Sequence, residues 1–422
     1  MGRGRILART RLATYDRRPD VGHSPRPHLY LRLTPHSLAF TILLGVLAAL
    51  PALSIDISAP TLPLLPHALG TSVTVASLTL SLFMVGFAFG QLSCGRLSDL
   101  RGRRPVLLAG LLCYTVAGLA CTASPSGLML VAARFAQGLG AGGCSVLSFT
   151  MVQDLFVGDA ARTKRSYVTV VLAIAPMLAP AIGALLCAQA GWRSVHAALT
   201  AGGALLLTIA ALGVGESRLL DATAGRPASA RARGRLRDDR QFVMATLANA
   251  LSYGAIFAYV AGSPMVIIGI MHLSPAVFAA VWASTAAALT AGAWLNGWLS
   301  RRGVPAAAIL HPSLAASAAA AVCLAAASLA GNTSGAWLVP PLLIIAFSRG
   351  FIAPNLQHLA IERWPEQAGG ASAAVGVSQL LSGAAASAIV AALLPQFGAA
   401  AVAAPMTLFA VLALIVWHRA SP

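Results

Sequence analysis

The chain has 422 residues, of which 58% are hydrophobic and only 10% are charged. Soluble globular domains carry about 25% charged residues, so the composition excludes that class and indicates a protein that crosses a membrane several times. The net charge of +17 does not indicate a nucleic-acid-binding protein, because the basic residues lie between apolar runs and do not gather with aromatic residues. The placement of basic residues between apolar runs predicts how the protein is oriented in the membrane and indicates contact with anionic lipid.

The N-terminal segment, residues 1–36, holds eight arginines against two aspartates and has no apolar period. We expect a cytoplasmic tail or an over-extended start, and an arginine-rich, acid-poor transit peptide is the alternative. The apolar run 38–57 is too long for the core of a typical signal peptide. It therefore predicts the first membrane span.

Eleven further apolar runs follow, each long enough to cross a hydrocarbon core of ~30 Å at ~1.5 Å per residue. Twelve spans are therefore expected, and prolines inside them predict kinks. The eleven runs are 73–94, 105–123, 126–150, 165–188, 193–214, 241–268, 275–299, 305–329, 335–360, 370–393 and 397–417, and the prolines are Pro51, Pro176, Pro180, Pro264 and Pro354.

Basic residues concentrate in alternate loops, whereas the loops between them hold only Arg193. This bias predicts that both termini are cytoplasmic. The segment 215–240, with seven arginines, is the longest polar interruption and divides the chain into two six-span halves, as in transporters built from related bundles. The predicted parts are a tail (1–36), a bundle (37–214), a linker (215–240), a second bundle (241–418) and a short tail (419–422).

The stretch Gly95–Leu108 joins the second and third spans and packs four arginines and one aspartate into ten residues. We expect a tight cytoplasmic turn in which Gly95 and Gly102 supply positive φ angles. The stretch resembles the cytoplasmic signature of the major facilitator superfamily, and only Leu100 replaces a usual basic residue. The resemblance implies an all-α integral membrane protein with 12 transmembrane helices in two six-helix bundles. The matching residues are Gly95, Leu97, Asp99, Gly102, Arg103 and Arg104.

Other segments resemble the Bcr/CflA branch of multidrug:proton antiporters, although Ile55 and Ser58 depart from its usual residues. This resemblance covers about residues 50–395 and implies export of drug-like molecules in exchange for protons. Its segments are 56–63, 86–92, 104–108, 134–138, 154–156, 259–264 and 368–373.

Asp56 is the only acidic residue well inside the apolar runs. Ionisable residues inside a membrane are costly and usually face an aqueous cavity or a partner. Asp56 could therefore take up a proton on one side and release it when the exposure of the cavity changes, as an antiporter requires. The alternative is a carboxylate at a helix end near Pro60 that faces water.

Two arginines lie inside the spans. Arg134, in R-F-A-Q-G, resembles a superfamily element, and its permanent charge could act on a nearby carboxylate or orient substrate. The alternative is a side chain that snorkels to the interface. Arg349 is the corresponding charge of span ten, for which a cavity role and local hydrogen bonding both stay open.

Polar residues in the second half are candidates for substrate binding, because such a pocket is mostly apolar with few polar anchors. Packing or interhelical hydrogen bonding is the alternative for each. The candidates are Asn249, Tyr253, Tyr259, Asn296, Arg349, Asn355, Gln357 and Gln379.

Span five resembles the superfamily's antiporter motif at Pro176, Pro180 and Gly183, with generic small-residue packing as the alternative. The resemblance further implies a gate at the cytoplasmic ends. There Asp99 lies opposite the start of span eleven, whose positive dipole end favours an anion. The gating candidates are Gly95, Asp99, Gly102, Arg103, Arg104 and Asp154.

Neither a nucleotide-binding P-loop nor an H-E-x-x-H motif occurs, and the six cysteines form no C-x-x-C pair. We therefore expect a transporter and not an enzyme, with no cofactor or metal. The expected partners are a small-molecule substrate, protons and membrane lipid, with no nucleic acid, for a monomer in the inner membrane. A transporter of one physiological metabolite and a non-transporting sensor or scaffold are the alternatives.

Overall fold

The computed structural model describes residues 33–156, 158–217, 236, 238–331, 335–364 and 368–420, and within these residues the chain is helical without strands. Eleven of the described helices are long and apolar enough to cross a membrane. They are α1 (Leu38–Asp56), α3 (Val73–Arg101), α4 (Arg103–Ala123), α5 (Gly127–Leu155), α6 (Asp159–Gly213), α8 (Arg240–Pro264), α9 (Pro275–Arg301), α10 (Ala306–Leu329), α11 (Gly335–Ile361), α12 (Ala368–Phe397) and α13 (Ala400–Ala420). Short helices η1 (Ala59–Leu64), α2 (Leu65–Ala68) and η2 (Met265–Ile270, a π-helix) complete the described elements.

The helix α6 contains two of the twelve predicted spans. Its backbone leaves helical geometry at Ala190 and Gly191, where Gly191 has a φ of +74°. Ser194 follows the break and donates its hydroxyl proton to the carbonyls of Leu186 and Gly191. Each predicted span therefore corresponds to a helix or to one arm of α6, and the twelve-span fold is confirmed.

Serine residues mark the starts of four long helices. The hydroxyl oxygen of Ser37 accepts a hydrogen bond from the backbone N–H of Phe40, and Ser72 does the same for Val75. Such N-caps satisfy backbone donors that have no partner within the helix. Ser126 and Ser274 cap α5 and α9 in the same way.

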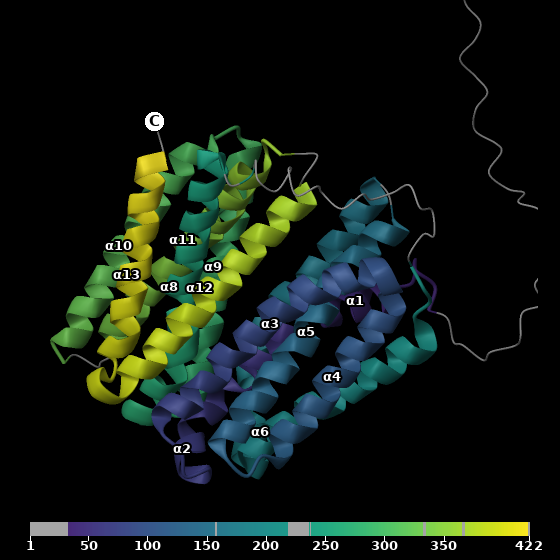
Figure 1. Cartoon of the computed structure of the whole chain (residues 1–422). Helices are drawn as coiled ribbons and strands as arrows, with labels where there is room; N and C mark the ends of the chain where they lie inside the picture. Colours follow the sequence, from purple (N-terminus) through teal and green to yellow (C-terminus); the bar gives the residue numbers. More distant parts are fainter. Residues whose placement is uncertain are drawn as a thin grey trace, which may run out of the picture. The chain divides into compact units, whose positions relative to one another are not determined.

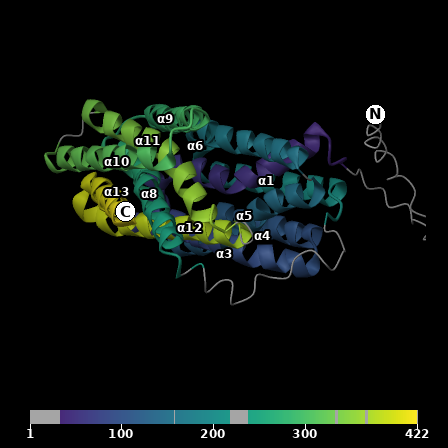
Figure 2. The ribbon, with the colours of Figure 1, turned by 90° about the horizontal axis from the view of Figure 1, so that it is seen from above.

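The helices before residue 217 pack mainly on one another, and so do those after residue 238 (Figures 1 and 2). Between these two sets, α3 packs against α12 and α6 packs against α9. This arrangement agrees with two six-span halves. The exact boundaries at 37, 214, 241 and 418 stay predictions, and most of the linker 215–240 lies outside the described residues.

Glycines allow two helix pairs to cross closely. In the first half, α3 and α5 cross so tightly that a Cβ atom on Gly138 would collide with the carbonyl oxygen of Phe83. In the second half, a Cβ atom on Gly292 of α9 would meet the carbonyl oxygen of Phe347 on α11. These pairs are the second and fourth spans of each half, so the same small-residue packing occurs twice.

Hydrogen bonds at the helix ends show which segments lie close to one another. Lys164 donates to the carbonyl of His36, and Arg104 donates to that of Val214. At the other end of the helices, Arg193 donates to the carbonyl of Ser124. We call the first end, with residues 96–104, the Arg103 end, and the second, with residues 57–72 and α2, the Pro60 end (Figure 1). The cytoplasmic assignment of the Arg103 end stays a prediction.

The connection between α3 and α4 corrects one prediction. The helix α3 continues to Arg101 and α4 begins at Arg103, so Gly102, with a φ of +98°, is the only residue between them. Gly95 lies inside α3, and the prediction that it has a positive φ was wrong. One residue suffices for the turn because Gly102 adopts a positive φ angle, which is readily open to glycine.

Candidate functional site

Asp56 is the last residue of α1, and its side chain is only 6% exposed. Among the described residues its carboxylate takes part in no hydrogen bond or salt bridge. It lies within electrostatic range of the hydroxyl groups of Tyr253 and Tyr259 on α8, in the other half. The structure thus places an unpaired acidic group at the border between the two halves.

Arg134 lies on α5 and is 1% exposed. Its guanidinium donates to the Oε1 atom of Gln137 at 2.8 Å, and to the carbonyl of Ser54 and the hydroxyl of Ser58 at 3.2 Å each. The guanidinium carbon lies 4.3 Å from the centre of the Phe83 ring. No described acidic residue pairs with it, so the structure does not bring Arg134 and Asp56 into an ion pair.

The surroundings of Arg134 include polar residues that the sequence analysis did not select. The hydroxyl groups of Ser54 and Tyr114 lie 2.7 Å apart. His196 on α6 is 2% exposed, interacts electrostatically with Arg134, and its Nδ1 atom has no partner among the described residues. A histidine in an apolar run is a visible signal, but only the fold shows that it faces Arg134.

Arg349 on α11 is 6% exposed, and its Nη1 atom donates to the Oδ1 atom of Asn249 at 2.9 Å and to the carbonyl of the same residue at 3.3 Å. It borders a cavity of about 220 Å³. Three residues predicted to bind substrate, Tyr253, Arg349 and Gln379, therefore meet in one cavity. The complete lining is Tyr253, Ile256, Leu289, Ala293, Arg349, Gly350, Ala353, Pro354 and Gln379.

The remaining substrate candidates lie elsewhere. The amide nitrogen of Asn355 donates to the Oδ1 atom of Asn296 at 2.6 Å, so these two residues join α11 to α9. This contact is the interhelical hydrogen bond that the sequence left as the alternative. Gln357 is half-buried on α11 and lines neither this cavity nor the one described next.

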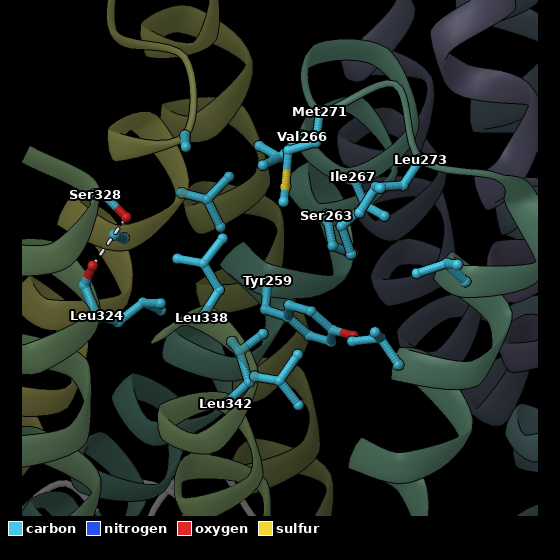
Figure 3. A pocket seen from close by; sticks show the side chains of 16 residues that line it. Tyr259, Ser263, Val266, Ile267, Met271, Leu273, Leu324, Ser328, Leu338 and Leu342 are labelled. Carbon is cyan, nitrogen blue, oxygen red and sulfur yellow. Dashed lines mark hydrogen bonds between the residues drawn. The ribbon is translucent and has the colours of Figure 1, made fainter. Parts of the chain in front are cut away.

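Tyr259 lines a second cavity, of about 120 Å³, inside the second half near the Pro60 end. Figure 3 shows the side chains of Leu338, Leu342 and Val266 around it. The hydroxyl of Ser328 donates to the carbonyl of Leu324, which leaves the wall almost wholly apolar. The Tyr259 hydroxyl lies beside Thr285 and Ser263 but meets the geometric criterion for a hydrogen bond with no described residue.

The two halves meet toward the Pro60 end. Ser81 on α3 donates to the hydroxyl of Ser387 on α12 at 2.7 Å, and both side chains are buried. The predicted antiporter residues Pro176, Pro180 and Gly183 lie on the first arm of α6, which packs against α1 and α9. A Cβ atom on Gly183 would collide with the carbonyl oxygen of Ile57, so this glycine allows α6 to approach the end of α1.

The gating candidates gather around Arg103. Its guanidinium contacts Asp99 at 2.5 Å and Asp154 at 2.8 Å, which joins α3, α4 and α5. Glu216, which the sequence analysis did not select, accepts hydrogen bonds from the backbone N–H groups of Arg103 and Arg104 at the start of α4. An anion is favoured at this position, the positive end of the helix dipole.

Asp99 is 65% exposed, and no described hydrogen bond or salt bridge joins it to α12. Among the described residues, no hydrogen bond or salt bridge forms the contact with the start of span eleven that the resemblance implies, and this contact stays a prediction. The described contacts of Asp99 are within the first half.

Comparisons with known proteins identify the family. A sequence model of the Major Facilitator Superfamily matches residues 44–388. The uncharacterized MFS-type transporter YdgK of Bacillus subtilis is 33% identical over 357 residues, which are 82% of this chain and 87% of YdgK. A chloramphenicol resistance protein of Pseudomonas aeruginosa is 37% identical over 169 residues, 40% of each chain. The multidrug resistance protein MdtL of Salmonella typhimurium is 28% identical over 237 residues, 55% of this chain and 59% of MdtL.

Solved structures show the same fold. A bacterial homologue of the human lysosomal transporter Spinster, in an inward-facing and occupied conformation, matches with a TM-score of 0.73 at 12% identity, over 92% of this chain and 97% of that one. A D-xylose-proton symporter matches with a TM-score of 0.70 at 16% identity, over 90% and 97%. The family match over most of the chain, together with the shared helical fold, shows that this multi-pass membrane protein is a transporter and not an enzyme, and that it belongs to the major facilitator superfamily.

Proposed function

We propose that the chain exports small, amphipathic or drug-like molecules across the bacterial inner membrane in exchange for protons. Asp56 carries the proton, and the cavity beside Tyr253, Arg349 and Gln379 holds the substrate. The names of two relatives, a chloramphenicol resistance protein and a multidrug resistance protein, support the choice of substrate class. A solved structure of the same fold is that of a D-xylose-proton symporter, so transport of a single metabolite is the alternative.

The observation that carries the proposal is the position of Asp56. A buried carboxylate without a partner is unfavourable inside a membrane, unless it is neutralised or exposed to water during the transport cycle. The hydroxyls of Tyr253 and Tyr259, in the other half, lie within electrostatic range of it. A movement of α8 relative to α1 would therefore change the surroundings of the carboxylate, and this change couples proton release to the transport cycle.

Uneven contacts between the halves support a mechanism of alternating access. The buried hydrogen bond between Ser81 and Ser387 joins α3 to α12 toward the Pro60 end. At the Arg103 end, Asp99 is exposed and makes no described contact with α12. This arrangement supports a state that is closed at the Pro60 end, from which rocking of the two bundles would open that end and close the other.

A flux experiment tests the function. The purified chain is placed in proteoliposomes with an imposed pH gradient, and movement of chloramphenicol and of a panel of amphipathic molecules is measured. We expect substrate to move against its own gradient when protons flow the opposite way. Substrate movement that does not depend on the pH gradient would contradict the assignment as an antiporter. A sensor would give no movement of any substrate, and transport of a single metabolite would remove the multidrug assignment.

The charge cluster at the Arg103 end yields a separate prediction. Asp99→Asn should slow efflux several-fold while substrate binding and thermal stability change little. Asp99 itself is solvent-exposed, and ion pairs at the surface contribute at most about 1 kcal/mol to folding. The exposed carboxylate of Asp99 can nevertheless turn from Arg103 toward the start of α12 when the Arg103 end closes. Transport rate, binding and melting temperature are measured on the same purified variant.

Glu362→Gln is the control, because Glu362 also contacts a residue four positions away, His358, and its other described partner, Gln241, also lies within the second half. It should leave the transport rate unchanged. Equal slowing by both variants would assign the effect to general surface charge and contradict a specific gate at Asp99.

A further inference from the structure

Arg349 is a permanent positive charge without an acidic partner among the described residues. A charged side chain inside a membrane is costly and usually faces a cavity or a partner. Asn249 supplies two acceptors, and both contact the same nitrogen, Nη1. The Nε and Nη2 atoms find no acceptor in the described part of the chain, although planar, paired N–H groups suit a carboxylate.

The cavity next to Arg349 has the size and lining for a small organic molecule. An apolar cavity of about 150 Å³ binds benzene, so the 220 Å³ here can hold a single ring with one small substituent. Ile256 and Leu289 provide apolar walls, and the Tyr253 ring, whose centre lies 5.6 Å from the guanidinium carbon, provides an aromatic one.

No described acidic residue lines the cavity. Tyr253, which lines the cavity, lies within electrostatic range of both Asp56 and Arg349. The cavity is therefore positive at its Arg349 wall. A cationic ligand is disfavoured at that wall, and a neutral ligand leaves the charge without a counterion.

We propose that this cavity selects organic anions, with the carboxylate of the ligand on the Nε and Nη2 atoms of Arg349 and an apolar or aromatic body against Ile256, Leu289 and Tyr253. The proposal rests on the proposed function, since it names the substrate class of the same cavity. It adds that charge, and not only apolar character, decides which molecules bind.

Three probes that share one ring and differ in charge test this proposal. Benzoate, benzamide and benzylamine are titrated onto the full chain in detergent, and the dissociation constant of each is obtained from ligand-dependent thermal stabilisation. We expect benzoate to bind most tightly and benzylamine most weakly. A hydrogen bond to a charged group contributes about 1.5–3 kcal/mol, so benzoate should bind about tenfold or more tightly than benzamide. Equal binding of these two ligands overturns the proposal.

Variants assign the preference to Arg349. Arg349→Gln should lose the preference for benzoate and keep benzamide binding, whereas Arg349→Lys should keep part of it because the charge remains. If Arg349 had only a structural role, its replacement would weaken the binding of all three ligands equally, and this result would contradict the proposal. Arg302→Gln is the control, because Arg302 lies over the Trp298 ring and outside the cavity, and it should bind all three probes like the unaltered chain.

The anion site and the proton antiport can be disproved independently of each other. Binding is measured at equilibrium without a gradient, and so it does not depend on proton coupling. If the chain prefers benzoate but its flux does not depend on the pH gradient, the anion site is supported and proton antiport is contradicted. If export is driven by the pH gradient but benzoate and benzamide bind equally, proton antiport is supported and the anion site is contradicted.

Discussion

Asp56→Asn is expected to abolish gradient-driven efflux while substrate binding stays measurable. Asparagine has nearly the same size as aspartate and keeps its polar oxygen, but it neither gains nor loses a proton. The buried site at the end of α1 therefore stays filled, and only the exchange of a proton is removed. The variant should still exchange labelled substrate for unlabelled substrate across the membrane, because this exchange needs no net proton movement.

Asp56→Glu is the companion variant for this test. It keeps a carboxyl group one methylene farther from the backbone, and it should retain part of the gradient-driven efflux. If the Asp56→Asn variant transports substrate against its gradient at the rate of the unaltered chain, Asp56 is not the proton carrier. Loss of binding in both variants would assign Asp56 to the substrate site instead.

The spans were predictable because membrane insertion depends on local sequence. A run of about 20 apolar residues must form a helix in lipid, since every backbone polar group has to be satisfied within the segment. The predicted first span, 38–57, and the observed α1, Leu38–Asp56, agree for this reason. The helical extension through Gly95 to Arg101 was missed because it lies beyond the apolar run, where hydropathy carries no information.

The site was predictable only in part. A charged side chain in an apolar run is visible in the sequence, which is why Asp56, Arg134 and Arg349 were selected. The partners of these charges were not predictable. Arg134 is satisfied by a carbonyl and a hydroxyl from α1 and its surroundings, and not by Asp56. Serine and carbonyl acceptors occur throughout the chain, so only the fold shows which ones lie close.

The partners of the residues predicted to bind substrate were not predictable from the sequence either. Asn296 and Asn355 are 59 positions apart, and they satisfy each other across two helices. Tyr253 and Gln379, on α8 and α12, meet at the cavity beside Arg349. All four are polar residues in apolar runs, and no local signal separates the pair that joins helices from the pair that lines a cavity.

Gly138→Ala is expected to destabilise the fold strongly, although it adds only one methyl group. The new Cβ atom would collide with the backbone carbonyl of Phe83, and backbone atoms cannot rotate away as a flexible side chain can. The helices α3 and α5 would have to separate along a crossing that Gly86, Gly90 and Gly142 also keep close. Overpacking of this kind costs about 1–3 kcal/mol or more. The melting temperature of the purified protein in detergent should fall clearly.

Gly202→Ala is the matched control, since it makes the same change within a helix at a position where a Cβ atom meets nothing within 4 Å. It should raise stability slightly, because alanine is favoured over glycine inside a helix by about 0.5–1 kcal/mol. Opposite signs for the two variants would show that close approach of α3 and α5, and not helix propensity, requires glycine at position 138. Equal melting temperatures would contradict the tight crossing. Because α9 and α11 cross at Gly292 in the same way, Gly292→Ala should behave like Gly138→Ala, as the repeat of this packing in the second half requires.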